Sequence, residues 1–427
     1  MMERVKRLLA RGHHLRWVLG DQAVVSGCNL AIAILLARAL GPSGFGIYAL
    51  ITVAQQYFVS ISVSMVGNPL VTAAPHARDA GEERRMIESG FAAQLVLGAG
   101  LAVLIAVAMA IFLHAGTLGI SVLTVTSLAV SSFGLPLLEW CRRLCFFNRD
   151  GPLLLQLDAL TYLPVLVGTA VAAGYDWLTL DVAVALWAGA SVVACAWGIY
   201  RLGVSLRLAG ARAFAARHWR AARDFVVSFQ AQWLGSQGIV YLVLPWVGTS
   251  GVGAYRSIIS LAGFINPIAT TLDNTLSFRF AEVYRKGGDP ALRRYALRAG
   301  TALMAGAALL LIPIAVFARG IVELFLGHAY APYASILYVH SLGIALVFAT
   351  KIALYHLRAR QQTRPIAWSS LAGATVSIVA ASVMARAFGP VGIAWSIVLG
   401  GAVSLAWLVC CIARDAKSPE PMSVPLK

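Results

Sequence analysis

The sequence predicts an all-α integral membrane protein with about twelve transmembrane helices in two pseudo-symmetric halves. Composition is the first observation. Of 427 residues, 59% are hydrophobic and 12% are charged, whereas about a quarter of the residues in a soluble domain are charged. Mean hydropathy is +0.77. The distribution of the apolar runs and an internal repeat are the other two observations.

The apolar runs have the length that a bilayer requires, about 20 residues each. They lie near 17–39, 45–73, 90–113, 117–140, 153–174, 178–200, 225–247, 252–277, 299–318, 333–355, 366–386 and 390–412. They are continuous and show no alternation of polar and apolar residues. They therefore predict helices rather than the strands of a membrane β-barrel.

The formal net charge is +16, and nearly all of the 34 Lys and Arg residues lie between the runs on one side. Only Arg38, Arg256, Arg319 and Arg386 fall on the other side, and Lys351 falls within a run. By the positive-inside rule, both termini are predicted to be cytoplasmic. No basic segment is interleaved with aromatic residues, so we do not expect a nucleic-acid partner.

A glycine-rich segment, LLARALGPSGFGIY at 35–48, connects the first two runs. Pro42 and its neighbouring glycines cannot sustain a regular helix and predict a tight turn between two helices. Five of its residues recur at a constant offset of 207: Gly41, Ser43, Gly44, Gly46 and Tyr48 correspond to Gly248, Ser250, Gly251, Gly253 and Tyr255. This recurrence predicts an internal duplication.

The duplication divides the chain into two halves that enter the membrane from the same side, as expected for a pseudo-twofold axis along the membrane normal. The predicted parts are a basic lead-in on the lipid headgroups at 1–16, an N-terminal lobe at 17–203, a basic cytoplasmic linker at 204–224, a C-terminal lobe at 225–413 and a disordered cytoplasmic tail at 414–427. The basic lead-in and linker suit contact with anionic membrane lipids.

LARALGPSGFGIYAL at 36–50, together with ELFLGHAYAPY at 323–333, resembles the polysaccharide-exporter branch of the MOP (multidrug/oligosaccharidyl-lipid/polysaccharide) flippase superfamily. The resemblance implies two six-helix lobes around a central cavity. It also implies alternating-access flipping of polyprenyl-diphosphate-linked oligosaccharides across the bacterial inner membrane, for exopolysaccharide, O-antigen or capsule synthesis. Polymerases and glycosyltransferases of such a pathway would be partners. The sugar is not specified.

A diphosphate substrate requires cationic groups, and sugars are held by aromatic and amide side chains. The candidate substrate-binding residues are Arg38, Tyr48, Gln55, Arg142, Tyr255, Arg256 and Lys351. Two structural roles compete with this prediction. Cations near span ends can extend to the membrane surface, and the polar side chains can pack against neighbouring helices.

An ionisable group within a span is costly and is a functional candidate for that reason. Asp21, Asp158 and Asp273, with Asn274 as an additional oxygen ligand, are the candidates for coupling transport to H⁺ or Na⁺. Pairing with Arg142, Arg143 or Arg279 is the structural alternative. Asn266 and Pro267 predict a kink in the eighth span.

No Walker A sequence occurs, and the eight histidines lack metal-ligand spacing. The sequence therefore predicts a transporter without cofactor or metal, not an enzyme. Two alternatives remain open. An ion-coupled antiporter for small molecules such as drugs would favour acidic residues in its cavity. A membrane-embedded glycan polymerase or ligase would carry a large outer loop, and the outer loops here are short.

Overall fold

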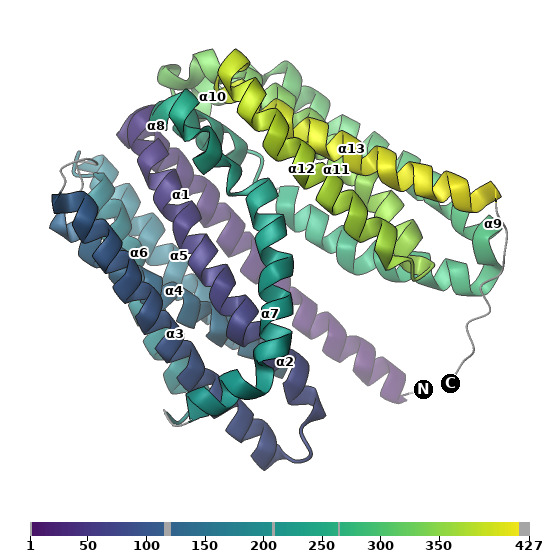
Figure 1. The fold of residues 1–427 in the computed structure, drawn as a ribbon, viewed down its shortest axis with the longest axis horizontal. Helices are drawn as coiled ribbons and strands as arrows, with labels where there is room; N and C mark the ends of the chain where they lie inside the picture. Colours follow the sequence, from purple (N-terminus) through teal and green to yellow (C-terminus); the bar gives the residue numbers. More distant parts are fainter. Residues whose placement is uncertain (1, 115–120, 207–209, 264, 418–427) are drawn as a thin grey trace. The chain divides into compact units, whose positions relative to one another are not determined.

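The computed structural model describes residues 2–114, 121–206, 210–263 and 265–417, which fold almost entirely as helices (Figure 1). The α-helices are α1 (Met2–Ser62), α2 (Asn68–Ala73), α3 (Ala80–His114), α4 (Val122–Asn148), α5 (Gly151–Gly174), α6 (Leu180–Leu202), α7 (Gly210–Ser236), α8 (Ile239–Ser260), α9 (Ile265–Val316), α10 (Ala318–Leu326), α11 (Ser335–Ala359), α12 (Thr363–Phe388) and α13 (Pro390–Lys417). A π-helical segment spans Val63–Gly67, and 3₁₀ turns span Ala74–His76 and His328–Tyr333.

In the described part of the chain, 10 segments are long and apolar enough to cross a membrane. The first of them, Gly20–Ala73, has 54 residues. A straight helix of that length would measure about 80 Å, more than twice the thickness of a bilayer core. A kink at Gly41 divides it into two stretches. These stretches correspond to the first two predicted spans.

The seventh and eighth predicted spans differ most from the structure. The run predicted at 225–247 is divided between α7 and α8, which meet at Gln237 and Gly238. The run predicted at 252–277 is interrupted where α8 ends at Ser260 and α9 begins at Ile265. Pro267 lacks the N–H that would bond to the carbonyl of Gly263, which favours a kink or a break in the helix at this point. The break lies just before the predicted Asn266–Pro267 kink.

The glycine-rich turns of the two halves have the same backbone conformation. Gly41 has φ 65° and ψ 179°, and Gly248 has φ 66° and ψ 179°. Essentially only glycine adopts this region without strain, because a Cβ would collide with the backbone. The predicted turn between two helices is confirmed at both positions. The repeat that is visible in the sequence is thus also a repeat of backbone geometry.

We expect Gly41→Ala and Gly248→Ala each to destabilise the protein by about 1–3 kcal/mol, the cost of holding a side chain in this region. Gly27→Ala is the control, because Gly27 lies inside α1 and a Cβ there would have nothing within 4 Å. The measurement is the thermal unfolding midpoint in detergent. An unchanged midpoint for both turn variants would contradict the strain.

The chain forms two compact units, Met1–Gln230 and Ala231–Lys427. In the first unit, α1 packs against α4 and α5, α4 packs against α3 and α6, and α5 packs against α6. In the second unit, α8 packs against α11 and α12, α11 packs against α9 and α13, and α12 packs against α13. The pairs correspond one to one when α1, α3, α4, α5 and α6 are equated with α8, α9, α11, α12 and α13. The two units therefore share one topology, as the duplication predicts.

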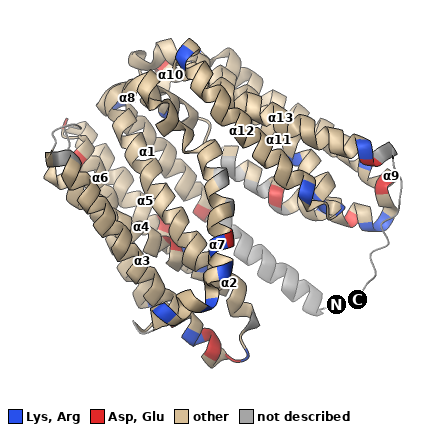
Figure 2. Cartoon of the chain, viewed as in Figure 1, with Lys and Arg blue, Asp and Glu red and all other residues tan. Residues whose placement is uncertain are grey.

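Apolar side chains form the outside of the helices as well as their interior. Trp140 and Leu144 lie in the core of the first unit, whereas Val103, Leu104 and Val107 on α3 are exposed. Charged residues gather toward the helix ends, and the central stretches of α3, α6 and α12 carry none (Figure 2). An exposed apolar surface of this kind is expected where lipid is the solvent.

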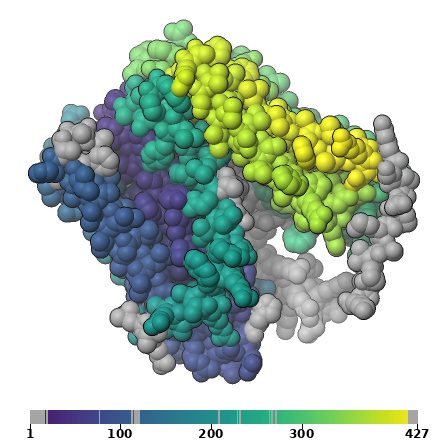
Figure 3. Space-filling view, viewed as in Figure 1, coloured from purple at the N-terminus to yellow at the C-terminus, as the bar shows by residue number. Residues whose placement is uncertain are grey.

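Small residues bring α12 and α13 into close contact, and the two helices lie side by side in Figures 1 and 3. A Cβ at Gly373 would fall 2.0 Å from the Ser404 Oγ, and one at Gly400 would fall 1.9 Å from the Ser377 Oγ. Ser404 also donates a hydrogen bond to the carbonyl of Ser369 at 2.9 Å. Close approach at small residues is the usual way in which membrane helices associate.

Candidate functional site

A charged cluster lies inside the first unit, where α1, α4 and α5 meet. Arg142, on α4, donates from Nη1 to the Glu139 Oε2 at 2.7 Å. Its Nε lies 2.9 Å from the Asp158 Oδ1 on α5 and donates to Oδ2 at 3.2 Å. The guanidinium is thus held between two carboxylates. The predicted alternative for Asp158, pairing with Arg142, is present in this structure.

Behind this ion pair lies a second carboxyl group. Asp21, on α1, lies near enough to the Asp158 carboxyl for the two groups to interact electrostatically. Both residues have 0% exposure. No protein group donates a hydrogen bond to either Asp21 oxygen among the described residues.

The charges around the pair do not balance when every group is ionised. Asp21, Asp158 and Glu139 would carry three negative charges. The nearby positive charges are those of Arg142 and of Arg143, whose Nε lies 3.5 Å from Glu139. Two adjacent buried carboxylates cannot both remain ionised at low cost.

Aromatic residues extend from this cluster toward Tyr48. Tyr162 lies one turn after Asp158 on α5, near Asn29 of α1. Its ring packs edge-on against Trp187 of α6 at 5.5 Å. Trp187 in turn donates from Nε1 to the Tyr48 hydroxyl at 2.9 Å. Tyr48, predicted to contact sugar, is buried and fixed by this bond.

The π-helical segment Val63–Gly67 packs against α4, the helix that carries Arg142 and Arg143. Arg143 donates from Nη1 to the Asn68 Oδ1 at 2.7 Å. A Cβ at Gly67 would fall 2.9 Å from the Arg143 Cδ, so glycine leaves room for this side chain. Gln55, another predicted substrate contact, is buried and donates to the Ser131 Oγ at 2.5 Å. π-Helical turns are frequent at functional sites.

The second unit contains a separate cation–carboxylate pair. Lys351, on α11, donates from Nζ to the Asp273 Oδ2 of α9 at 2.5 Å, and the Tyr355 hydroxyl donates to Oδ1 at 2.6 Å. The Lys351 side chain is 16% exposed and that of Asp273 is 41% exposed. Two predicted site residues therefore meet here. The side chain of Asn274, predicted beside Asp273, lies outside those that the structure describes.

The other predicted cations occupy different environments. Arg256, on α8, donates from Nη1 to the Gln237 Oε1 at 2.7 Å, and the adjacent Tyr255 is buried. Arg38 is exposed on α1. At the start of the second sequence motif, Glu323 accepts a hydrogen bond from Arg319 at 2.9 Å, and this bond lowers the pKa of the Glu323 carboxyl. The Arg319 side chain is exposed and that of Glu323 is partly exposed, so the two form an ordinary surface pair.

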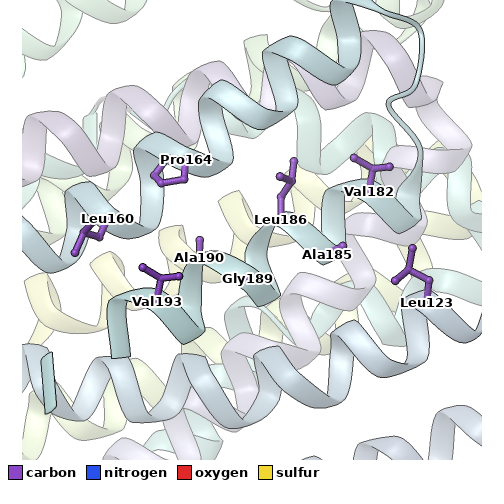
Figure 4. Close-up of a pocket in the computed structure, with 9 residues that line it drawn as sticks. All are labelled: Leu123, Leu160, Pro164, Val182, Ala185, Leu186, Gly189, Ala190 and Val193. Carbon is purple, nitrogen blue, oxygen red and sulfur yellow. The ribbon is translucent and has the colours of Figure 1, made fainter. Parts of the chain in front are cut away.

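An apolar pocket of about 410 Å³ lies against α4, α5 and α6 (Figure 4). Leu160 and Pro164 line it from α5, and Leu186 and Val193 line it from α6. All of its lining residues are apolar, so the pocket suits hydrocarbon and offers nothing to a charged headgroup. In the part of the chain that the structure describes, no group of three or more His, Cys, Asp or Glu residues is placed to hold a metal ion.

The sequence singled out Asp21, Asp158 and Arg142 and offered pairing with Arg142 as the alternative, but it did not predict that Asp21 lies near Asp158. It did not single out Glu139, Tyr162, Tyr355 or Asn68 as site residues. One signal was available. Glu139 and Arg142 have a spacing of three residues, which places them on one helix face. Nothing in the sequence specified which carboxylate of another helix would face them.

No protein-family model matches the chain, and no curated protein matches it by sequence. Solved structures do match. An inward-facing multidrug-resistance MATE-family transporter of the MOP superfamily gives a TM-score of 0.77 at 15% identity, over 93% of this chain and 96% of the other. The lipid II flippase MurJ, in an inward closed conformation, gives 0.70 at 12% identity, over 93% and 87%. A MOP-superfamily transporter from Pyrococcus furiosus gives 0.61 at 13% identity, over 95% of each chain. This chain therefore has the all-helical membrane fold of MOP-superfamily transporters.

Proposed function

We propose that the protein flips polyprenyl-diphosphate-linked oligosaccharides across the bacterial inner membrane by alternating access. The observation that supports this most is the presence of a partly accessible cation inside each unit. The side chains of Arg142 and Lys351 are 20% and 16% exposed. Within the apolar part of the chain, Arg142 contacts two carboxylates and Lys351 contacts one. A cation in a span suits an anionic headgroup that must cross hydrocarbon.

The apolar pocket on α4, α5 and α6 is compatible with such a substrate, because a polyprenyl chain needs a hydrocarbon surface while its headgroup crosses. The fold is compatible with flipping as well as with drug export. Among the similar structures, one is named as a lipid II flippase and others as multidrug-resistance transporters. With both termini cytoplasmic, the substrate would be received from the enzymes that assemble it inside the cell.

An ion-coupled antiporter for cationic small molecules is the second candidate. The two buried acids Asp21 and Asp158 favour the antiporter, because their carboxyl groups could exchange a proton for an organic cation. The Arg142 guanidinium beside the pair weakens this candidate, since it would repel a cation from the same place. An enzymatic function has no comparable support from the described residues.

Reconstituted vesicles distinguish the candidates. We expect the purified protein to move a short-chain polyprenyl diphosphosugar from the outer to the inner leaflet, measured as loss of its accessibility to an added glycosidase. Lipid-only vesicles and vesicles with heat-denatured protein are the controls. Proton-driven uptake of ethidium, with no movement of the diphosphosugar, would favour the antiporter and contradict the proposed function.

A further inference from the structure

In the second unit, an aromatic side chain bonds to the carboxylate that contacts Lys351. Tyr355, one turn after Lys351 on α11, donates from its hydroxyl to the Asp273 Oδ1 at 2.6 Å, while Lys351 donates to Oδ2 at 2.5 Å. Each oxygen of the Asp273 carboxylate thus accepts a hydrogen bond from a different donor. The two donors differ in charge: the ammonium group of Lys351 would be attracted by a phosphate, whereas the Tyr355 hydroxyl is neutral.

The packing around Tyr355 holds its hydroxyl in place. Tyr355 is 1% exposed and lies in an apolar cluster with Phe280. The rings of Phe280 and Tyr355 lie 5.7 Å apart, and Tyr295 packs edge-on against Phe280 at 5.0 Å. A hydroxyl on a ring held in this way cannot follow a ligand, whereas Lys351 has a flexible aliphatic chain. The hydroxyl therefore stays in place when the ammonium group moves.

We propose that Tyr355 is a positioning residue for substrate binding, which stabilises the Asp273 carboxylate when Lys351 turns from it to the diphosphate. This inference rests on the proposed function, because it assumes that Lys351 receives the diphosphate. Tyr355 acts through Asp273 and does not touch the substrate. No covalent bond changes in the exchange, since one hydrogen-bonded ion pair replaces another.

The sign of the effect follows from the two states of Asp273. A residue changes ligand affinity only by the difference between its interactions with and without the ligand. Without the ligand, Lys351 neutralises the carboxylate, so the bond from Tyr355 adds little. With the ligand, the carboxylate loses this cation, and a hydrogen bond to an unpaired charge is stronger. The Tyr355 hydroxyl therefore stabilises the ligand-bound state more than the free state and raises the affinity for an anion.

Two features limit the size of the effect. The Asp273 side chain is 41% exposed, so water can replace part of a lost hydrogen bond. Arg358, an exposed residue three positions after Tyr355, also attracts Asp273 through its charge. Coupling factors between sites in proteins commonly lie between about 5 and 150. We expect a factor at the lower end of this range, about fivefold.

The test uses the full-length protein in detergent and P1-farnesyl-P2-methyl diphosphate as the probe. Equilibrium binding is measured at neutral pH and at one detergent concentration for every variant. Tyr355→Phe keeps the buried ring and removes only the hydroxyl, so it should bind the probe about fivefold more weakly than the parent. Asp273→Asn should bind the probe more tightly than the parent, because an amide holds Lys351 less strongly than a carboxylate does.

The double variant Tyr355→Phe/Asp273→Asn distinguishes positioning from packing. If the hydroxyl acts through the Asp273 carboxylate, its removal should have no further effect once that carboxylate is an amide. The double variant should then bind as tightly as Asp273→Asn. If the hydroxyl only supports the packing of α11 on α9, its removal should weaken binding equally in both backgrounds, and the inference would be wrong. Thermal unfolding midpoints show whether each variant is folded.

The matched control is Tyr295→Phe, which removes a hydroxyl from the same aromatic cluster, whereas the hydrogen bonds to Asp273 come from Lys351 and Tyr355. It should bind the probe as the parent does. If the parent binds the probe and Tyr355→Phe binds it equally well, the inference is overturned and the proposed function stands. Absence of probe binding by the parent would contradict both.

Discussion

Transport by the Asp158→Asn variant should not respond to an imposed proton gradient, whereas the rate of the parent should change with it. The reason is the burial of two carboxyl groups, Asp21 and Asp158, because under the proposed ion coupling one of them would exchange a proton and so bias two conformations of similar energy. The amide that replaces the Asp158 carboxyl group in this variant cannot exchange that proton. The measurement is flipping of a polyprenyl diphosphosugar in reconstituted vesicles, with and without the gradient.

Asp273→Asn provides the comparison in the second unit. Asp273 is held by Lys351 and Tyr355 rather than by another acid, so we expect this variant to keep its response to the proton gradient. A parallel series with a sodium gradient distinguishes the two ions. A parental rate that ignores both gradients would assign the acid pair a purely structural role.

Lys351→Ala should reduce flipping by about 10- to 100-fold. A hydrogen bond to a charged group contributes about 1.5–3 kcal/mol, and each 1.4 kcal/mol corresponds to a factor of ten. The loss should appear both in reconstituted flipping and in surface polysaccharide. The amount of protein in the membrane should stay normal, because Tyr355 still donates to Asp273 after the substitution.

Exchanging the charges of Lys351 and Asp273 distinguishes a substrate-binding role of Lys351 from a purely structural one. The double variant Lys351→Asp/Asp273→Lys keeps an ion pair between α9 and α11 but moves the cation to the other helix. If the pair only joins the helices, the exchange should restore activity. If Lys351 receives the diphosphate, the double variant should remain as defective as Lys351→Ala. Restored flipping would therefore mean that Lys351 has a structural role and does not bind the diphosphate.

The sequence by itself determined the class of the protein and much of its topology. Continuous apolar runs required membrane helices, because backbone groups in lipid must be bonded within their own segment. Gly41 and Gly248 marked equivalent turns, because the backbone conformation there excludes other residues. Local steric rules of this kind act within a few residues and can be read without knowledge of the fold.

The ends of α7, α8 and α9 were harder to predict from the sequence. Apolar composition continues across the breaks near Gly238 and Gly263, so hydropathy alone could not place them. Pro267 indicated a kink, because a missing N–H is a local property. The exact end of α8 depends on the 3₁₀ hydrogen bonds of residues 261–263, which a sequence pattern does not specify.

Only the tertiary structure decided how the charged residues combine. An intramembrane Asp is costly wherever it lies, so Asp21, Asp158 and Asp273 were each recognisable as candidates. Whether a carboxylate faces an acid or a base depends on the rotation and pairing of whole helices. The packing of α1 and α4 on α5 gave Asp158 both Asp21 and Arg142, and the packing of α9 on α11 gave Asp273 a lysine. These contacts join distant segments and are set by packing over entire helix faces, which no local pattern encodes.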